Sequence, residues 1–325
     1  MSSYLSLFHT GSLTERAEHL TERLASCNIC PHNCGVNRLR GELGFCHSGA
    51  LPIVSSHCVH HGEEPALSGT RGSGAIFFGN CNLRCIYCQN HQISQNQMSQ
   101  KANEINADSL ADMMLSLQVK GCHNINLVSP NHFAPQIVQA LVLAIPLGLS
   151  IPLVYNTNAY DNIETLRELN GIIDIYLPDL KYASNNNSEK YSQAPNYAQV
   201  ARAAIREMFF QVGELQTNED GLAERGLIVR HLILPNNIAG TNESLQWLAR
   251  DVSPNITVSL MSQYHPTHQA ASYRELARPI SALEYASAEH SLADAGIENG
   301  WVQDLSAPDN YLPDFTRPGH PFENT

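Results

Sequence analysis

The stretch Gly74-Ala-Ile-Phe-Phe-Gly-Asn-Cys81-Asn-Leu-Arg-Cys85-Ile-Tyr-Cys88 places three cysteines, spaced C-x3-C-x2-C, directly after a short apolar run. Such a run, edged by glycines, predicts a buried strand that delivers the thiols onto a loop at its carboxyl end. A structural zinc site and an ordinary electron-carrying iron–sulfur cluster each have four protein ligands. Three thiols therefore indicate a [4Fe-4S] cluster in which one iron stays open to a substrate or cofactor, as a catalytic zinc keeps one position open.

Two more side chains of this loop fit such a site. Arg84 supplies a positive charge that favours thiolate over thiol. Tyr87 offers a ring face on which a nucleobase can lie. The residues alone leave two alternatives open, which are a coincidence of three cysteines and a zinc site completed by a neighbour such as His91.

The segment Gly79-Asn-Cys81-Asn-Leu-Arg-Cys85-Ile-Tyr-Cys88-Gln-Asn90 resembles the cluster loop of the radical S-adenosylmethionine (SAM) superfamily. More narrowly, it is similar to that of the pyruvate formate-lyase activating enzymes and their PflX-like branch. The resemblance implies that Cys81, Cys85 and Cys88 are the catalytic ligands of a [4Fe-4S] cluster whose open iron is chelated by S-adenosylmethionine. One electron then cleaves the sulfonium and releases a 5′-deoxyadenosyl radical. The resemblance also implies an external electron donor such as flavodoxin or ferredoxin, and a glycyl-radical enzyme as the partner that loses a hydrogen atom.

The composition is that of a globular enzyme. The 325 residues are enough for one large α/β barrel or two modest domains, and 43 % of them are apolar, so a sizeable core is possible. With 19 basic and 31 acidic residues the formal charge is −12, and no basic run stands out, which argues against a nucleic-acid partner. Residues 1–10 have no signal-peptide pattern, and the longest apolar stretch, 137–155, is broken by Gln139 and by prolines. We therefore expect a cytoplasmic protein with no membrane partner.

Seven of the nine cysteines fall into two tight groups, which in a chain without a secretory signal indicates metal binding rather than disulfides. The first group, Cys27, Cys30, Cys34 and Cys46, has the spacing C-x2-C-x3-C-x11-C and predicts a second metal site. The metal can be zinc or a second iron–sulfur cluster, acting as a structural knuckle or as an electron relay. A disulfide pair is the weakest alternative. Similar cysteines precede the barrel in PflX-like sequences, so the resemblance extends to this group.

The segment between the two cysteine groups holds less specific features. Cys58, like Cys122 further on, stands alone and is expected to be a buried or incidental thiol, although histidines beside Cys58 leave metal contact open. Gly62-Glu-Glu-Pro65 is similar to the Gly-Gly-Glu-Pro turn with which many radical SAM enzymes bind the amino group of the cofactor. Because it lies before the cluster loop instead of after it, we expect only a polar turn that packs the first lobe on the barrel.

The rest of the chain alternates between strand and helix patterns. A capping-box pattern at Ser12-Leu-Thr-Glu15 predicts a helix over 12–25. Six strands are predicted over 74–79, 124–129, 151–156, 172–180, 227–234 and 256–263. The helices between and after them are predicted over 109–120, 133–145, 163–169, 188–212 (one or two), 242–250 and 273–295.

Six strand–helix pairs predict an α/β fold, a parallel sheet closed or half closed into a partial (β/α)6 TIM-like barrel, with a doubly wound sheet as the alternative. We therefore expect three parts. Residues 1–71 form an N-terminal helix and a Cys-rich metal-binding lobe, and residues 72–305 form the barrel. Residues 306–325 form a proline-rich tail that is an extended strap or a loose end.

Polar residues stand where the predicted strands end, and in such folds chemistry collects at the carboxyl ends of the strands. By resemblance, Asn156-Thr-Asn158 corresponds to a turn near the ribose and carboxylate of the cofactor. Asp179-Leu-Lys181 corresponds to an Asp-x-Lys turn whose ammonium pairs with that carboxylate. Ser129 begins a segment that departs from the Gly-Gly-Glu of the family. The expected cofactor-binding set is Tyr87, Ser129, Asn156, Asp179 and Lys181, and the expected additional pocket lining is His231, Met261 and Gln263.

Three functions follow, in order of preference. The first is a radical SAM enzyme that activates a glycyl-radical enzyme, and the second has the same chemistry but acts on a small molecule or a peptide. The third is a non-catalytic iron–sulfur electron carrier or metal-binding scaffold, which would show cluster redox cycling without cleavage of the cofactor.

Overall fold

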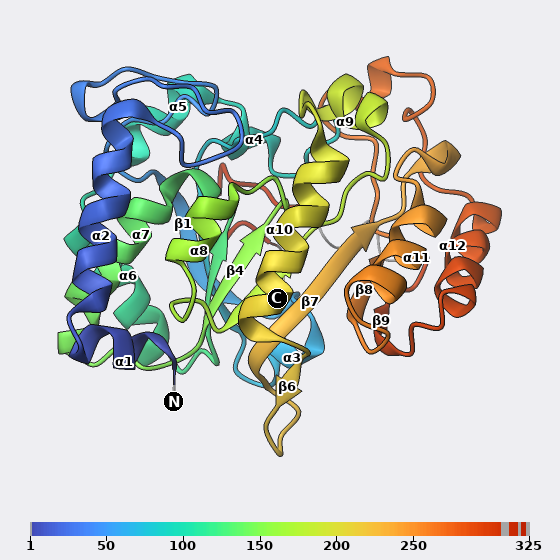
Figure 1. The fold of residues 1–325 in the computed structure, drawn as a ribbon. Helices are drawn as coiled ribbons and strands as arrows, with labels where there is room; N and C mark the ends of the chain where they lie inside the picture. The colour runs from blue at the N-terminus through green and yellow to red at the C-terminus, as the bar shows by residue number, and fades with distance from the viewer. Residues whose placement is uncertain (1, 307–311, 318–319, 323–325) are drawn as a thin grey trace.

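The computed structural model describes residues 2–306, 312–317 and 320–322, which form a curved sheet with helices outside it (Figure 1). The strand order is β1-β2-β3-β4-β5-β7-β8-β9, and β6 pairs with β7. From β2 to β9 the neighbours in this order are parallel, whereas β1 and β6 are antiparallel to β2 and β7. The strands are β1 Val54–His60, β2 Ser73–Phe78, β3 Ile125–Val128, β4 Leu153–Thr157, β5 Ile175–Pro178, β6 Gln216–Thr217, β7 Ala223–Leu232, β8 Thr257–Met261 and β9 Asn299–Val302.

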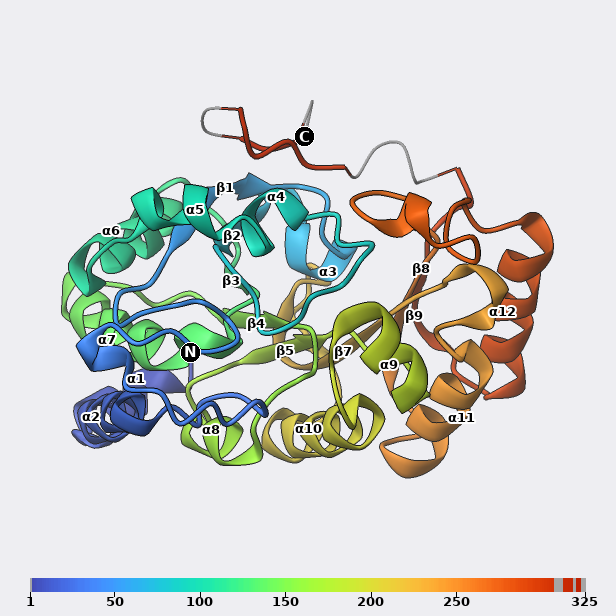
Figure 2. The same ribbon diagram turned by 90° about the horizontal axis from the view of Figure 1, so that it is seen from above.

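Each parallel strand lies beside the parallel strand that precedes it in the sequence, which is how strands wind around a barrel. A doubly wound sheet would reverse its order at a switch point, so that alternative is wrong. In the part of the chain that the structure describes, β1 and β9 end the sheet without pairing with each other. The mixed α/β fold with a largely parallel sheet is therefore confirmed, as a partial barrel with one open side (Figure 2).

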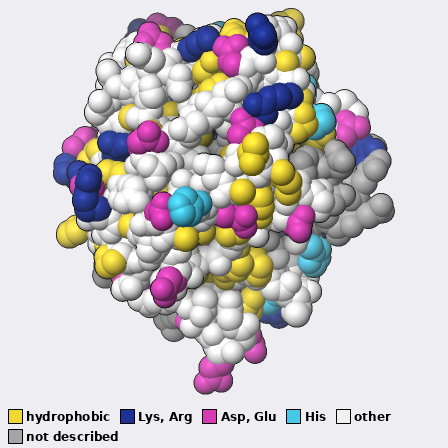
Figure 3. All heavy atoms as spheres, turned by 90° about the vertical axis from the view of Figure 1, so that its right-hand side faces the viewer, with side chains coloured by type: hydrophobic (Ala, Val, Ile, Leu, Met, Phe, Trp, Pro, Cys, Tyr) yellow, Lys and Arg dark blue, Asp and Glu magenta, His cyan; other side chains and the backbone are white. Residues whose placement is uncertain are grey.

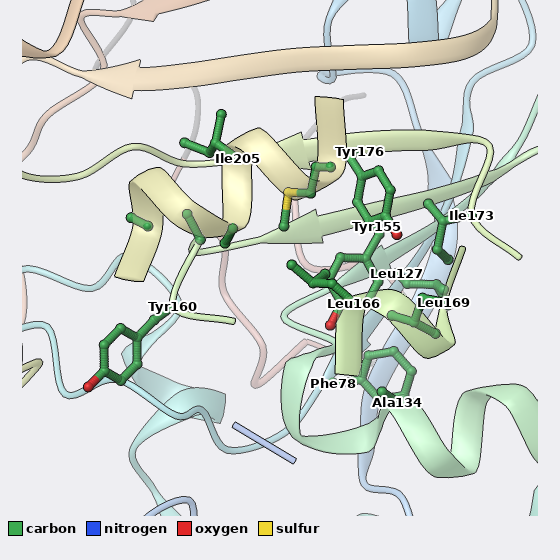
Figure 4. Close-up of a cluster of buried hydrophobic side chains, with 14 of the residues drawn as sticks. Phe78, Leu127, Ala134, Tyr155, Tyr160, Leu166, Leu169, Ile173, Tyr176 and Ile205 are labelled. Carbon is green, nitrogen blue, oxygen red and sulfur yellow. The ribbon is translucent and has the colours of Figure 1, made fainter. Parts of the chain in front are cut away.

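Helices cover the outer face of the sheet (Figure 1). At one end α7 packs against both α2 and α6, and at the other end α11 packs against α12. The helices are α1 Tyr4–His9, α2 Ser12–Glu22, α3 Pro65–Ser68, α4 His91–Ser94, α5 Gln97–Gln100, α6 Ala107–Val119, α7 Ala134–Ala144, α8 Ile163–Glu168, α9 Asn185–Ser192, α10 Tyr197–Val212, α11 Thr241–Asp251 and α12 Ala282–Asp294. Between sheet and helices, Tyr155 and Tyr176 meet edge to face, 5.8 Å apart, and pack beside Leu166 of α8 (Figure 4). Their aromatic rings fill the outer core while their hydroxyls keep hydrogen-bond partners.

The six predicted strands correspond to β2, β3, β4, β5, β7 and β8, but two local predictions are wrong. The capping box at Ser12 does not form, because Gly11, in a left-handed conformation, precedes the helix and no side chain caps it. The helix predicted over 273–295 begins only at Ala282, where Ser281 and Glu284 form a true capping box. The sequence patterns also miss β1 and β9.

α3, which follows β1, closes the barrel at the amino ends of the parallel strands. β1 runs down along β2, pairing Val54 with Phe78 and His60 with Ser73. The chain then turns into α3, whose Ala66 and Leu67 pack against side chains of β4, β5 and β7. Because this plug fills one end, any cavity in the barrel must lie toward the carboxyl ends of the strands.

The surface carries mixed charges. On the face that presents α11 and α12, acidic and basic side chains are interspersed and hydrophobic ones form a band between them (Figure 3). In residues 2–306, 312–317 and 320–322, no helix has both the length and the apolar character needed to cross a membrane.

Gly226 is required where β5 and β7 meet. It pairs with Ile175, has φ +128°, and an added Cβ would lie 2.5 Å from the backbone oxygen of Glu214. We expect Gly226→Ala to lower the thermal midpoint by at least about 3 °C, because backbone must shift in the middle of the sheet. In the control Gly221→Ala, φ is also positive but the Cβ enters open space, so a smaller loss is expected. Equal midpoints for the two variants would contradict the steric role of Gly226.

Candidate functional site

The loop after β2 opens onto a cavity of about 210 Å³ inside the barrel, and Cys81, Cys85 and Cys88 all line it. The cavity is lined as well by every residue of the predicted cofactor-binding set, Tyr87, Ser129, Asn156, Asp179 and Lys181, and by Met261 and Gln263. These side chains come from the ends of different strands, and the barrel brings them together because the carboxyl ends of its parallel strands share one rim. His231 is the exception.

His231 does not line the cavity, so its prediction is wrong. It is fully buried, and its ring nitrogens bond the backbone oxygen of Leu180 (2.7 Å) and the hydroxyl of Thr241 (3.0 Å). Successive side chains of a strand point to opposite faces. Because Arg230 and Leu232 of β7 face the cavity, His231 between them faces the helices.

Each of the three thiols has a polar group at hydrogen-bond distance from its sulfur. The amide of Asn158 approaches the sulfur of Cys81 at 3.4 Å, and the hydroxyl of Ser192 approaches that of Cys85 at 3.0 Å. The hydroxyl of Ser94 lies 3.3 Å from the sulfur of Cys88. Such contacts to sulfur tune the potential of an iron–sulfur cluster, and sequence reasoning missed them because isolated Ser and Asn residues have no distinctive spacing.

Burial raises the pKa of both the Cys81 and the Cys85 thiol to about 11, so a metal that binds them must displace protons. Arg84 moderates this effect for Cys81, as the sequence predicts, but burial outweighs it. Among the described residues, no three or more His, Cys, Asp or Glu side chains are arranged to hold a metal ion. Three thiols that border one cavity, each with a polar group at its sulfur, are nevertheless the donor set that an iron–sulfur cluster needs.

The other side of the cavity is charged. The ammonium of Lys181 lies 2.8 Å from Asp179, and the guanidinium of Arg230 also lies 2.8 Å from Asp179. Arg230 donates further bonds to Asn156 and, at 3.3 Å, to Glu63. Burial favours the neutral form of Asp179, but the two cations outweigh it and hold the pKa of Asp179 below its ordinary value. The carboxylate and both cations are therefore charged at neutral pH.

The position of Glu63 shows that the interpretation of Gly62–Pro65 as only a packing turn is wrong. The turn does not merely pack a lobe on the barrel, because Glu63 lines the cavity and accepts a hydrogen bond from Asn126 of β3 at 2.9 Å. The antiparallel strand β1 carries it there. In the sequence, the only signal for this position is the similarity of Gly62–Pro65 to a cofactor-binding turn, and its place before the cluster loop argues against that role.

Two hydrogen-bonded groups fix the turns that follow β4 and β5. The hydroxyl of Tyr197 accepts from the backbone N–H of Lys181 (2.9 Å), and its one proton lies within reach of two backbone oxygens, those of Asn158 (2.9 Å) and Asp179 (2.8 Å). Asn158 also donates to the side chain of Asn82 in the cluster loop. Tyr87 is held nearby, with its hydroxyl 2.7 Å from that of Tyr182.

The first cysteine group lies directly beside the cluster loop. Burial, together with the neighbouring thiols Cys46, Cys27 and Cys34, raises the pKa of Cys30. This segment contacts the cluster loop through three residues of each. His32 donates to the backbone oxygen of Asn82 (2.8 Å), Asn80 donates to that of His47 (3.1 Å), and Arg84 lies over the ring of Phe45 (4.7 Å).

Three further candidates, His91, Cys58 and Cys122, lie outside the two cysteine groups. His91 donates to the backbone oxygen of Cys88 and stacks on His268, 4.9 Å away, so its contacts are not with the thiols. Cys58 and Cys122 are buried, as expected for structural thiols.

Comparison with known proteins matches part of the chain to a family. Residues 75–209 match the model of the radical SAM superfamily. The uncharacterized protein MJ0674 of Methanocaldococcus jannaschii is 29 % identical over 263 residues, which cover 80 % of this chain and 72 % of that protein. The uncharacterized protein MJ0808 of the same organism is 24 % identical over 324 residues, covering 95 % and 86 %.

Asp161 stabilises the turn that follows β4, and its raised pKa can be tested by the pH dependence of stability. It accepts hydrogen bonds from Thr157 (2.6 Å), Asn131 (2.7 Å) and Tyr155 (3.1 Å), and burial raises its pKa from 3.8 to about 6. The folded chain then holds a proton that the unfolded chain releases between about pH 4 and 6, so this group lowers stability as pH rises through that window.

We expect the free energy of unfolding of the native chain, minus that of Asp161→Asn, to fall between about pH 4 and 6 and then to level off. Urea denaturation at a series of pH values measures it, with the exposed Asp220→Asn as the control. Parallel profiles for the native chain and Asp161→Asn would contradict the raised pKa.

Proposed function

We propose that the chain is a radical SAM enzyme, which cleaves S-adenosylmethionine reductively at a [4Fe-4S] cluster to abstract a hydrogen atom from a substrate. The match of residues 75–209 to the radical SAM model supports an enzyme with these two cofactors. One observation supports the assignment of this cavity to the cluster and the cofactor most strongly. Cys81, Cys85 and Cys88 line the same cavity as Asn156 and Lys181, although these residues lie up to 100 positions apart (181 − 81).

In this proposal the three thiols hold the cluster and leave one iron without a protein ligand. Lys181 pairs with the carboxylate of the cofactor, because Asp179 keeps the ammonium charged and aimed at the cavity. Asn156 and Ser129 bind polar groups of the cofactor, and Tyr87 provides a ring face for the adenine. Ser192, Ser94 and Asn158 set the electron affinity of the cluster through the sulfurs.

Two classes of molecule can donate the hydrogen atom in this proposal. The likeness of residues 79–90 to activating enzymes favours a glycine of a glycyl-radical enzyme, with flavodoxin or ferredoxin as the electron donor. A small molecule is favoured by the cavity, because the tail residues Pro313 and Phe322 form part of its wall and narrow the access of a folded partner.

We further propose that Cys27, Cys30, Cys34 and Cys46 bind zinc or a second cluster. Four thiols in one short segment, packed on the cluster loop through His32 and Phe45, support a metal that stiffens this loop or passes electrons to it.

Anaerobic reconstitution with iron, sulfide, dithionite and S-adenosylmethionine tests the main proposal. We expect 5′-deoxyadenosine from the native chain and at least about 100-fold less from Cys85→Ala, since even the loss of residues that only contact a metal's ligands costs about 10–100-fold. Cys122→Ala removes a buried thiol outside both groups and should behave as the native chain does. Equal, trace amounts of 5′-deoxyadenosine from the native chain and Cys85→Ala would exclude the proposed cleavage.

Metal analysis tests the second site. Relative to the native chain, we expect Cys30→Ser to lose either about one zinc or about four irons while keeping the iron that Cys85→Ala loses. Unchanged metal content in Cys30→Ser would show that the first cysteine group binds no metal.

A further inference from the structure

One wall of the cavity is not used by the proposed cofactor. His60 of β1, Phe77 of β2, Leu232 of β7, Met261 of β8 and Phe322 of the tail line it, and we name these five residues the open-side wall. β1 and β2 lie at one end of the strand order, and β7 and β8 lie toward the other.

We propose that the open-side wall binds the substrate, and that the substrate is a small uncharged molecule with a planar apolar body and a hydroxyl group that hydrogen-bonds His60. This inference rests on the proposed function, because it names the kind of molecule that loses the hydrogen atom.

His60 supplies the polar contact. Its side chain lines the cavity and is only 5 % exposed, and its buried Nδ1 has no hydrogen-bond partner among the described residues. A buried polar atom without a partner is unfavourable, so the site favours a ligand that can pair with it. Burial, together with His320, His61 and Arg230, lowers the pKa of His60 to about 4, so the imidazole is neutral at pH 7. A hydroxyl donates and accepts, and therefore suits either tautomer of a neutral imidazole.

Aromatic and aliphatic side chains make up the rest of the wall. The ring of His60 stacks on that of Phe322 at 4.4 Å with an interplanar angle of 27°, and the ring of Phe77 lies 6.0 Å from Phe322. Met261 adds a polarizable thioether, which packs well against aromatic rings. These surfaces match a planar apolar molecule.

Charge in the cavity points to an uncharged substrate. The charged side chains that line it, Glu63, Asp179, Lys181 and Arg230, are paired with one another. Because Lys181 is assigned to the carboxylate of the cofactor and Arg230 is held by Asp179 and Glu63, an ionic substrate would have to compete for groups that already have charged partners, which favours an uncharged substrate.

The tail limits the size of the substrate. Phe315 packs on Phe77, and its backbone N–H donates to Gln92 of α4 at 2.8 Å. His320 bonds the backbone oxygen of Val59 in β1 at 2.9 Å. The described parts of the tail thus lie along the open side of the barrel, so a small molecule fits the remaining space better than a loop of another protein.

Three probes of one shape test the proposal: benzyl alcohol, toluene and the cation benzylamine. Their dissociation constants are measured by ligand-observed NMR on the cluster-loaded chain. Because a hydrogen bond contributes about 1 kcal/mol, we expect benzyl alcohol to bind about fivefold more tightly than toluene, and benzylamine more weakly than both. His60→Phe keeps a ring on Phe322 and should abolish the preference for the alcohol, whereas His60→Gln keeps a hydrogen-bonding group and should retain it. His268→Phe makes the same change outside the cavity and should leave the preference intact.

Equal binding of benzyl alcohol and toluene by the native chain, or an unchanged preference in His60→Phe, would overturn the inference. Formation of 5′-deoxyadenosine is assayed in the same samples. Cleavage of the cofactor without a preference for the alcohol contradicts this inference alone, and the preference without cleavage contradicts the proposed function alone.

Discussion

The guanidinium of Arg230 links several strands by hydrogen bonds in the interior of the barrel. From β7 it reaches Asp179 after β5, Asn156 of β4 and Glu63 beyond β1. A buried cation is tolerated only when its donors are paired, and removing one partner of such a group costs on the order of 3–5 kcal/mol. This requirement fixes the ends of four strands relative to one another. It also holds Asp179 where it can orient Lys181 toward the three thiols.

The cluster loop is shaped by residues that lie far from it in the sequence. Asn158 approaches Cys81 from the turn after β4, and Ser192 approaches Cys85 from the end of α9. From the other side, His32 and Phe45 of the first cysteine segment contact Asn82 and Arg84. A loop held from two sides loses little conformational freedom when it binds a cofactor, and that pre-organisation favours tight binding. The contact with the cysteine segment also offers a direct route by which a second metal centre would influence the first.

The sequence predicts the barrel well because its parallel strands are buried on both faces and form continuous apolar runs, such as Gly74–Phe78. It predicts the place of Lys181 because the polar ends of such strands share a rim. It fails at β1, where Val54–His60 mixes buried and half-exposed positions without the alternation of a surface strand. Missing β1 means missing Glu63, because only the reversal of the chain at that strand carries this carboxylate into the cavity. The prediction that His231 lines the cavity fails for a simpler reason, since an error of one residue along a strand moves a side chain to the other face.

The central claim is that three thiols hold a cluster whose fourth iron is open to the cofactor. Electron paramagnetic resonance of the reduced, reconstituted chain, recorded before and after addition of S-adenosylmethionine, tests it most directly. We predict a reduced-cluster signal that changes on addition of the cofactor, both in the native chain and in a variant of the first cysteine group. A cluster signal that does not respond to the cofactor would mean that no iron is open to it, and would leave an electron carrier in place of a radical enzyme.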